Sequence, residues 1–378
     1  MIYLNNAATS YPKPNSVVSA VKNYLLQMPW EPGRGSDKNK LDILTQCRHK
    51  IAELFHIDDI SRIILTSGST VALNITIQGL ANNQINSHCI TSTIEHNSVL
   101  RPLNHLSKSN DLKITYITTA KLNNVTEFEK ALQKFTRFVV LNHVSNVTGT
   151  ILPIKEIAIW CSKKGLPLII DTSQSAGSID INVKEFPENI ILVFTGHKGL
   201  MGPMGTGGFY LGTDIELFEP LIQGGTGIRS DLLFQPKELP LYYEAGTMNL
   251  PGFAGLIEGI NFVTKIGVSQ IGLYKHKLFS RLHKLLSGIE RATFYSPLDK
   301  EYAGSVFSVN IAGWHPKDLG YVLHESYGII NRTGLHCAPL IHKDIGSYPE
   351  GAVRLSCSWF TTMDEIERTA EAIQMIVK

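Results

Sequence analysis

The sequence predicts an α/β fold with a mostly parallel central sheet in a large domain, followed by a smaller α+β domain at the C-terminus. Between about residues 40 and 212, short apolar runs alternate with helical patterns. Strands that are apolar on both faces, with helices between them, are typical of a parallel sheet that helices cover on two sides. Near residue 250 the pattern changes to amphipathic helices and a further strand candidate. We therefore expect a large domain at residues 15–250 and a small domain formed by residues 1–14 and 251–378.

The predicted strands of the large domain are five short apolar runs of β type. They lie at residues 63–66, 89–91, 138–141, 167–170 and 190–194. Helical patterns separate several of them, as at residues 154–160, and a further helix is expected from about Val71. In the small domain we expect a strand at 304–309 and helices at 253–265, 270–288, 316–325 and 363–377.

Composition limits the classes of function. The chain has 378 residues, 43% hydrophobic and 18% charged, which is ordinary for a soluble globular protein. The formal net charge of +2 gives no reason to expect nucleic acid or an anionic membrane as a partner. No run approaches the roughly 18 apolar residues of a membrane span, and no secretory signal is visible. The five cysteines are irregularly spaced, which favours a reducing, cytoplasmic location over a disulfide framework.

A lysine in a glycine-rich turn is the first indication of chemistry. Lys198 follows the apolar run 190–194 and stands in the sequence Gly-His-Lys-Gly. A desolvated lysine amine can condense with a carbonyl cofactor. A solvated loop lysine is the commoner interpretation of such a residue taken alone. Other parts of a cofactor site appear in order along the chain, and they favour the functional interpretation.

Two more motifs follow predicted strands, where ligands bind in parallel α/β sheets. Asp171 ends one apolar run, and a carboxylate there could keep a pyridine nitrogen protonated. Gln174 could hydrogen-bond a phenolic oxygen. The alternative is that Asp171 caps a helix. The Ser-Gly-Ser-Thr segment at 67–70 could cradle a phosphate at a helix N-terminus, although such residues are also common helix starts.

Three further residues extend the candidate site. His96, before a predicted helix, could stack on a cofactor ring, although a lone histidine there is more often structural. Cys337 lies in the segment 332–337, whose arginine and histidine can favour a reactive thiolate. Arg354, inside an apolar strand, could capture a substrate carboxylate or form a buried ion pair. His336, Cys337 and His342 could together suggest a metal site, but no fourth ligand is evident and their spacing is irregular. No metal site is therefore expected.

The ordered set of motifs resembles the cysteine desulfurase and selenocysteine lyase family, in the class V aminotransferase group of pyridoxal phosphate (PLP) enzymes. The resemblance is carried by the Gly-His-Lys turn, Asp-x-x-Gln, the Glu95-His96 pair and the late Arg-x-Gly-x-His-Cys loop, and it covers nearly the whole chain. It implies a type I PLP-dependent transferase fold and a homodimer with active sites at the subunit interface. The short cysteine loop, carried by the small domain, is more similar to the second group of desulfurases, which often use a separate sulfur-acceptor protein.

The resemblance also implies residue roles. Lys198 is the Schiff-base lysine, Cys337 becomes a persulfide, and His96 stacks on the ring and takes part in catalysis. The remaining cofactor-binding positions are Ser69, Thr70, Asp171, Gln174, Thr195, His197 and Thr247. Of these, Thr247 resembles the threonine that reaches the phosphate of the partner subunit. The substrate-binding positions are Asn146, Arg34, Arg332 and Arg354.

The expected function is that of a PLP-dependent cysteine desulfurase, which converts L-cysteine to L-alanine and transfers sulfur to Cys337. The alternatives are a selenocysteine lyase acting on L-selenocysteine, another class V activity such as an aminotransferase, and a non-catalytic PLP-binding scaffold. Asp37 stands where the family commonly has a histidine, Leu335 replaces the first histidine of a frequent His-His-Cys loop, and the segment 355–360 is unusual. These departures fit a divergent subgroup whose physiological substrate need not be plain cysteine.

Overall fold

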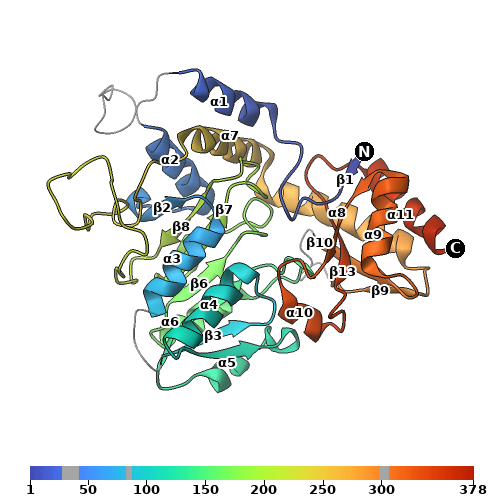
Figure 1. The fold of residues 1–378 in the computed structure, drawn as a ribbon, viewed down its shortest axis with the longest axis horizontal. Coiled ribbons are helices and arrows are strands. Elements are labelled where there is room, and N and C mark those ends of the chain that lie inside the picture. Colours follow the sequence, from blue (N-terminus) through green and yellow to red (C-terminus); the bar gives the residue numbers. More distant parts are fainter. Residues whose placement is uncertain (28–41, 82–86, 298–305) are drawn as a thin grey trace.

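The computed structural model describes residues 1–27, 42–81, 87–297 and 306–378. The strands of its large sheet are β2 (Ile63–Thr66), β3 (His88–Ser92), β4 (Lys113–Ile117), β5 (Thr136–Asn142), β6 (Leu168–Asp171), β7 (Ile190–Thr195) and β8 (Gly207–Leu211). Their order across the sheet is β2-β8-β7-β6-β5-β3-β4 (Figure 1). Neighbours from β7 to β4 run parallel, whereas β8 is antiparallel to both of its neighbours. The predicted α/β fold with a mostly parallel sheet is confirmed.

Both faces of this sheet are buried. In β6, Leu168 and Ile170 join one core cluster, while Ile169 joins the other. Aliphatic side chains on both faces are the pattern of parallel strands that helices cover. The first cluster includes residues of α2 (Ile43–Phe55), α5 (Val125–Ala131), α6 (Ile154–Lys163) and α7 (Leu250–Ile266). The second includes residues of α3 (Ser69–Ala81) and α4 (Asn97–Ser109).

The five predicted strands of the large domain coincide with β2, β3, β5, β6 and β7, but β4 and β8 were not predicted. Strand β4 lies at the edge of the sheet and buries only Ile117 fully, so its apolar signal is weak. Strand β8 begins with two glycines. A Cβ on Gly208 would lie 2.2 Å from the carbonyl oxygen of Ile64, so the close approach of β8 to β2 requires glycine there.

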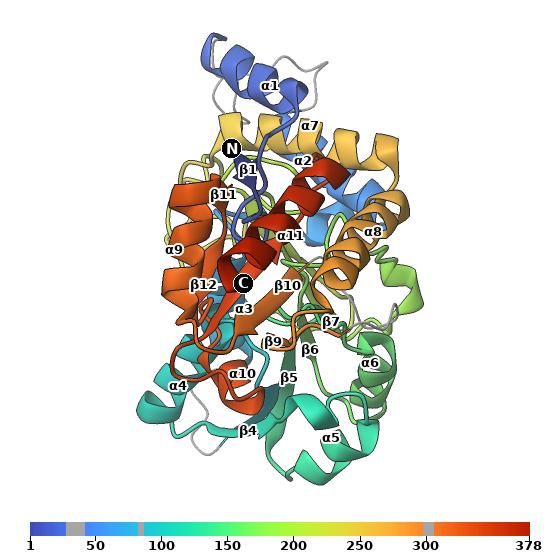
Figure 2. The ribbon, with the colours of Figure 1, turned by 90° about the vertical axis from the view of Figure 1, so that its right-hand side faces the viewer.

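The smaller part contains an antiparallel sheet. Its strands are β9 (Ala292–Phe294), β10 (Val306–Ile311), β12 (Arg332–Gly334) and β13 (Ala352–Ser356), in the order β12-β13-β10-β9. Its hydrophobic core includes residues of α8 (Val268–Leu286), α9 (Pro316–Tyr327) and α11 (Met363–Val377). Figure 2 shows α11 lying over this sheet between α9 and α8. Strand β1 (Ile2–Tyr3) pairs in parallel with β11 (Ile329–Ile330), so the N-terminus lies beside the small sheet.

Helix α7 packs on the large sheet. Phe253, Leu256 and Ile260 belong to the core of that sheet, and α7 contacts α1 (Asn15–Leu25) along its length. The two helices lie together above the large sheet in Figure 1. The sequence pattern changes at residue 250, where α7 begins. Nevertheless, the buried side chains of α7 pack in the hydrophobic core of the large sheet. The exact limits of the two domains stay a prediction.

The strand order decides where a site can form. Parallel strands end at the same edge of a sheet, so the segments that follow β3, β5, β6 and β7 meet there. His96, Asp171 and Lys198 lie in or directly after these strand ends. In the smaller part, the loop that carries Cys337 connects β12 to helix α10 (Pro339–Asp344). Figure 1 shows α10 next to the large sheet, so this loop lies near the same edge.

Candidate active site

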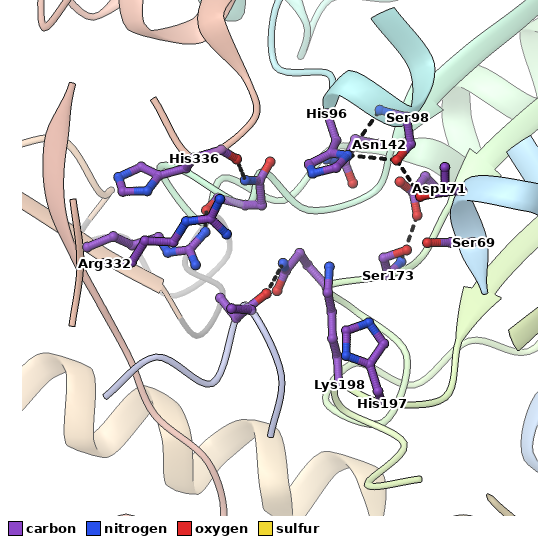
Figure 3. A pocket seen from close by; sticks show the side chains of 16 residues that line it. Ser69, His96, Ser98, Asn142, Asp171, Ser173, His197, Lys198, Arg332 and His336 are labelled. Atoms are coloured by element: carbon purple, nitrogen blue, oxygen red, sulfur yellow. Dashed lines mark hydrogen bonds between the residues drawn. The ribbon is translucent and has the colours of Figure 1, made fainter. Parts of the chain in front are cut away.

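A cavity of about 200 Å³ opens at the carboxyl ends of the parallel strands (Figure 3). The predicted site residues that line it are Ser69, Thr70, His96, Asn146, Asp171, Gln174, His197, Lys198, Arg332 and Arg354. The lining also includes Ala7, Ala8, Ser98, Asn142, Ser173 and His336, which were not among the predicted site residues. Asn142 could have been found, because it ends β5 just as Asp171 ends the neighbouring β6.

Lys198 lies in a tightly packed turn after β7. A Cβ on Gly199 would lie 2.1 Å from the carbonyl oxygen of Ala176, so the turn requires glycine on the C-terminal side of the lysine. Burial lowers the pKa of Lys198 to about 8, although the Asp171 carboxylate opposes the shift. A larger fraction of the amine is therefore neutral and nucleophilic near neutral pH than for an exposed lysine.

The N-terminal segment anchors the backbone of the lysine turn. The carbonyl oxygen of His197 accepts hydrogen bonds from Thr9 Oγ1 at 3.1 Å, Ser10 N at 3.0 Å, Ser10 Oγ at 3.1 Å and Lys13 Nζ at 2.9 Å. This carbonyl belongs to the peptide bond that leads directly into Lys198. The segment that begins at β1 thus helps to fix the orientation of the lysine.

Asp171 and Gln174 form one wall of the cavity. Asp171 is only 3% exposed, and its Oδ1 accepts a hydrogen bond of 2.9 Å from Ser173 N. The carboxylate therefore does make a local turn contact of the kind that the capping interpretation expected, while it also lines the cavity. The side chain of Gln174 donates to the carbonyl oxygen of Ala7 at 3.0 Å, which links this wall to the N-terminal segment.

His96 lies on another wall, where it caps α4. Its Nδ1 accepts a hydrogen bond of 3.1 Å from Ser98 N and lies 2.9 Å from Ser98 Oγ. Burial lowers the pKa of His96 to about 4, and the positive charge of Lys198 acts in the same direction. The ring is therefore neutral at physiological pH.

The start of α3 supplies a place for an anion. Helix α3 begins at Ser69, directly after Gly68, whose φ of +148° is a backbone conformation that favours glycine. A Cβ on Gly207 would lie 2.7 Å from Gly68 Cα. Free N–H groups at a helix N-terminus attract phosphate. Thr195 is buried next to Gly68, since a Cβ built on Gly68 would lie 3.7 Å from Thr195 Oγ1.

The cysteine loop closes the cavity from the small sheet. His336 and Cys337 both adopt left-handed backbone conformations, with φ of +49° and +60°. The loop is tied to the large part by two hydrogen bonds: Asn97 N donates to the Cys337 carbonyl at 2.6 Å, and Asn146 Nδ2 donates to the His336 carbonyl at 2.8 Å. Because non-glycine residues rarely adopt this conformation, these contacts help to hold the loop in one shape.

Cys337 differs from the other cysteines in its accessibility. It is partly exposed, whereas Cys47, Cys89, Cys161 and Cys357 are buried. Burial raises the pKa of the thiols of Cys47 and Cys357 to about 12, and it also raises those of Cys89 and Cys161. Buried thiols of this kind are inert, so Cys337 is the candidate nucleophile.

Arg354 is a cation without a carboxylate partner in the described part of the chain. It is 1% exposed in β13; its Nη1 donates to the Asn146 carbonyl at 2.9 Å and its Nη2 to Asn5 Oδ1 at 3.4 Å. Its buried Nε has no partner among the described residues. The buried ion pair considered from the sequence is therefore not found within that part of the chain. A guanidinium left this way in a cavity favours an anionic ligand.

Three predicted residues of the described part of the chain do not line this cavity: Thr195, Thr247 and Cys337, the last of which directly follows the lining residue His336. Thr247 lines a separate pocket beside Arg48 and Glu244, which form a buried ion pair. Arg34 lies outside the described residues, as does Asp37.

The comparisons with known proteins identify the family of the chain. A sequence model of the family described as Aminotransferase class-V matches residues 2–369. The chain belongs to this family. It is 32% identical to a probable cysteine desulfurase of Pyrococcus abyssi, with 100% of this chain and 94% of that protein covered. It is 30% identical to a probable cysteine desulfurase of Methanothermobacter thermautotrophicus, with 99% and 94% covered.

A solved class-V structure has the same fold. The apo structure of cysteine desulfurase from Thermococcus onnurineus NA1 superposes with a TM-score of 0.88 at 29% identity, covering 100% of this chain and 94% of that one. The predicted type I fold of PLP enzymes and the predicted family are therefore confirmed. Membership of this family identifies the chain as an enzyme of a PLP-dependent class.

The cavity residues fit the cofactor of the class-V family. Lys198 offers a partly deprotonated amine, and Asp171 offers a buried carboxylate at the end of the neighbouring strand β6. Several buried polar atoms at the cavity have no partner among the described residues: Asn142 Oδ1, Asn146 Oδ1, Ser173 Oγ, His197 Nδ1 and Arg354 Nε. Buried polar groups are nearly always hydrogen-bonded, so these atoms indicate a polar ligand.

The described residues show neither a metal cluster nor a membrane-spanning helix. No cluster of three or more histidine, cysteine or acidic side chains there is arranged to hold a metal ion. Nor does any helix in those ranges have the length and apolar character needed to cross a bilayer.

Proposed function

We propose that this class-V enzyme is a cysteine desulfurase, which converts L-cysteine to L-alanine and takes the sulfur onto Cys337. One observation carries the proposal: the partly exposed Cys337 thiol accepts a hydrogen bond from Arg332, and Arg332 lines a cavity together with the Lys198 amine and the uncompensated Arg354 guanidinium. These three groups supply a sulfur acceptor, an amine that can hold PLP, and a cation for the substrate carboxylate. The names of the relatives support the same activity.

The cofactor would be held by residues at the ends of four strands, β2, β3, β6 and β7. Lys198 would bind its carbonyl carbon, Asp171 its ring nitrogen, and the start of α3 with Ser69 its phosphate. Gln174 would contact the phenolic oxygen and His96 would cover the ring. When bound, PLP supplies an electron sink that stabilises charge at the α-carbon of an amino acid.

The protein side chains then divide the remaining work. Arg354 and Asn146 hold the substrate carboxylate, which orients the α-hydrogen toward the Lys198 amine. With a pKa lowered to about 8, that amine can accept and return a proton near neutral pH. The Cys337 thiolate attacks the substrate sulfur; a sulfur–sulfur bond forms as the carbon–sulfur bond breaks. The electron pair of the broken bond remains with the carbon skeleton, which takes up protons and leaves as alanine.

We also propose that the enzyme works as a homodimer. Thr247 lies away from the cavity of its own chain, as expected for a residue that serves the partner's phosphate site. The segment before it exposes large apolar side chains, with Leu233 97% and Phe234 87% exposed. Exposed apolar side chains of this size mark interaction surfaces. A separate sulfur-acceptor protein and a cytoplasmic location remain parts of the same proposal.

The experiment measures alanine and sulfide together. Purified protein loaded with PLP is given L-cysteine and a thiol reductant, and L-selenocysteine is tested in parallel. We expect the two products from cysteine in equal amounts, and their loss in Cys337→Ala. Cys161→Ala, a buried cysteine on α6, is the matched control. Absence of alanine in the wild type, or native turnover in Cys337→Ala, contradicts the proposal; a strong preference for selenocysteine would instead identify a selenocysteine lyase.

A further inference from the structure

A chain of three side chains runs along one wall of the cavity. His96 Nδ1 lies 2.9 Å from Ser98 Oγ, and Ser98 Oγ lies 2.8 Å from Thr70 Oγ1 (Figure 3). The same Nδ1 is 3.1 Å from the backbone nitrogen of Ser98, which donates to it at the start of α4. All three residues line the cavity, and Ser98 was not singled out by the sequence.

The backbone bond decides where the imidazole proton lies. A backbone N–H can only donate, so Nδ1 of His96 must accept and carries no hydrogen. A neutral ring then has its hydrogen on Nε2. A protonated ring would place a second N–H against Ser98 N, and Lys198, Arg332 and Arg354 add positive charge that opposes it. Asp171 is the group that acts in the other direction.

The direction of the two hydroxyl bonds follows from the same fact. Because Nδ1 is an acceptor, the contact of 2.9 Å with Ser98 Oγ requires the Ser98 hydroxyl to donate to the ring. The contact of 2.8 Å between the hydroxyls then requires Thr70 to donate to Ser98. Thr70, Ser98 and His96 thus form a chain of donors that ends on Nδ1, away from the other ring nitrogen.

We propose that Ser98 is a positioning residue that fixes His96 as its neutral Nε2–H tautomer and so presents an N–H donor to the cavity. No described residue hydrogen-bonds Nε2, which leaves this N–H available to a ligand. The consequence for catalysis rests on the proposed function. His96 donates a hydrogen bond from Nε2 to the bound substrate. Because Nε2 already carries its hydrogen, the ring can accept a proton there only if that hydrogen moves to Nδ1, which breaks the bond from Ser98 N. Removal of the α-proton therefore falls to Lys198.

The tautomer is measured directly by nitrogen-15 NMR of the PLP-loaded full chain with labelled histidine. The His96 signals are identified by their absence in His96→Gln. From about pH 6 to 8 we expect an unprotonated Nδ1 and a protonated Nε2. A protonated Nδ1 or an imidazolium in this range would overturn the proposal. The measurement needs no turnover, so its result is independent of whether cysteine is the substrate.

Variants of Ser98 test the role of the hydroxyl. Ser98→Ala keeps the backbone donor and loses the hydroxyl donor to the neutral ring. We therefore expect the titration midpoint of His96 to rise by about half to one pH unit and kcat to fall about tenfold. Ser98→Thr keeps a hydroxyl and is expected to restore the midpoint. Ser107→Ala, on the exposed side of the same helix, is the matched control. An unchanged midpoint in Ser98→Ala would remove Ser98 from the proposed role.

Discussion

The guanidinium of Arg332 donates a hydrogen bond of 3.1 Å to the sulfur of Cys337. Arg332 begins β12 and Cys337 follows five residues later, so one short loop supplies both the nucleophile and a positive charge beside it. The thiolate is the form that attacks a substrate sulfur, and the Arg332 N–H group lies where it can hydrogen-bond that sulfur. The left-handed conformation of Cys337 gives the loop the sharp turn that brings the two side chains together.

Replacing Arg332 tests this relationship. We expect Arg332→Gln to slow persulfide formation on Cys337 about tenfold to hundredfold, because the negative sulfur loses a charge-assisted hydrogen bond. Mass spectrometry after a single exposure to cysteine measures the persulfide. Arg101→Gln, an exposed arginine on α4, controls for the change in net charge. Equal rates in the wild type and Arg332→Gln would show that the contact has no part in sulfur transfer.

The lowered pKa of Lys198 predicts how cofactor uptake depends on pH. The neutral amine is the reactive form, and burial lowers the pKa of this lysine to about 8. We expect the rate of PLP binding to the cofactor-free protein to rise with pH and to level off above about pH 8. The visible absorbance band of the bound cofactor reports the rate.

Two lysine variants accompany that measurement. Lys198→Ala is expected to lack the band and to resist covalent fixation of PLP by borohydride, whereas Lys163→Ala, at the exposed end of α6, retains both. Borohydride fixation of PLP in Lys198→Ala would assign the attachment to another lysine.

The sequence predicted those parts of the site that follow strands. Asp171 and Lys198 were found because each stands at the end of a strongly apolar run, and parallel strands place such residues at one edge. Ser98 was missed because its contact with Thr70 joins two segments that are 28 residues apart. Asn142 was missed although it ends β5 just as Asp171 ends β6. Thr247 lies in another pocket, a separation that no local pattern reveals. The edge strand β4 and the glycine-rich β8 were missed because their residues are not uniformly apolar.

Glu95 predicts a pH-dependent stability. It is fully buried between β3 and β5, where its Oε1 accepts from Ser92 Oγ at 2.5 Å and from Asn142 N at 3.0 Å. Burial raises its pKa to about 8, and the nearby Asp171 adds to the shift. The folded protein therefore holds a proton on Glu95 that the unfolded chain releases above about pH 4.5. This contribution to stability is complete below pH 4.5 and is lost as the pH rises toward 8.

Glu95→Gln removes this dependence, since glutamine cannot ionise. As the pH rises from 5 to 8, the wild type should lose stability that the variant keeps. We therefore expect the free energy of unfolding of the variant to increase by a few kcal/mol relative to that of the wild type. Urea unfolding of both proteins at several pH values measures the difference. Glu53→Gln, an exposed residue on α2, is the control. A difference that stays constant across this range would show that Glu95 is already ionised at pH 5.

Arg354 predicts how the enzyme recognises the carboxylate of its substrate. The guanidinium is buried and donates a hydrogen bond to the Asn146 carbonyl, but it has no acidic partner within the described ranges. A substrate carboxylate can therefore form an ion pair with it. Cysteamine is cysteine without that carboxylate. We expect the wild type to prefer cysteine strongly over cysteamine in kcat/KM, since leaving a buried charge unpaired costs several kcal/mol.

Arg354→Gln should lose most of its activity with cysteine and change little with cysteamine, because only the first substrate makes the ion pair. The ratio of the two kcat/KM values is therefore expected to fall by about a hundredfold or more. This ratio separates carboxylate binding from a general disturbance of the site, which would lower both values together. Arg332→Gln is the informative comparison, because its guanidinium contacts the sulfur nucleophile and should affect both substrates. An unchanged ratio in Arg354→Gln would place the substrate carboxylate elsewhere in the cavity.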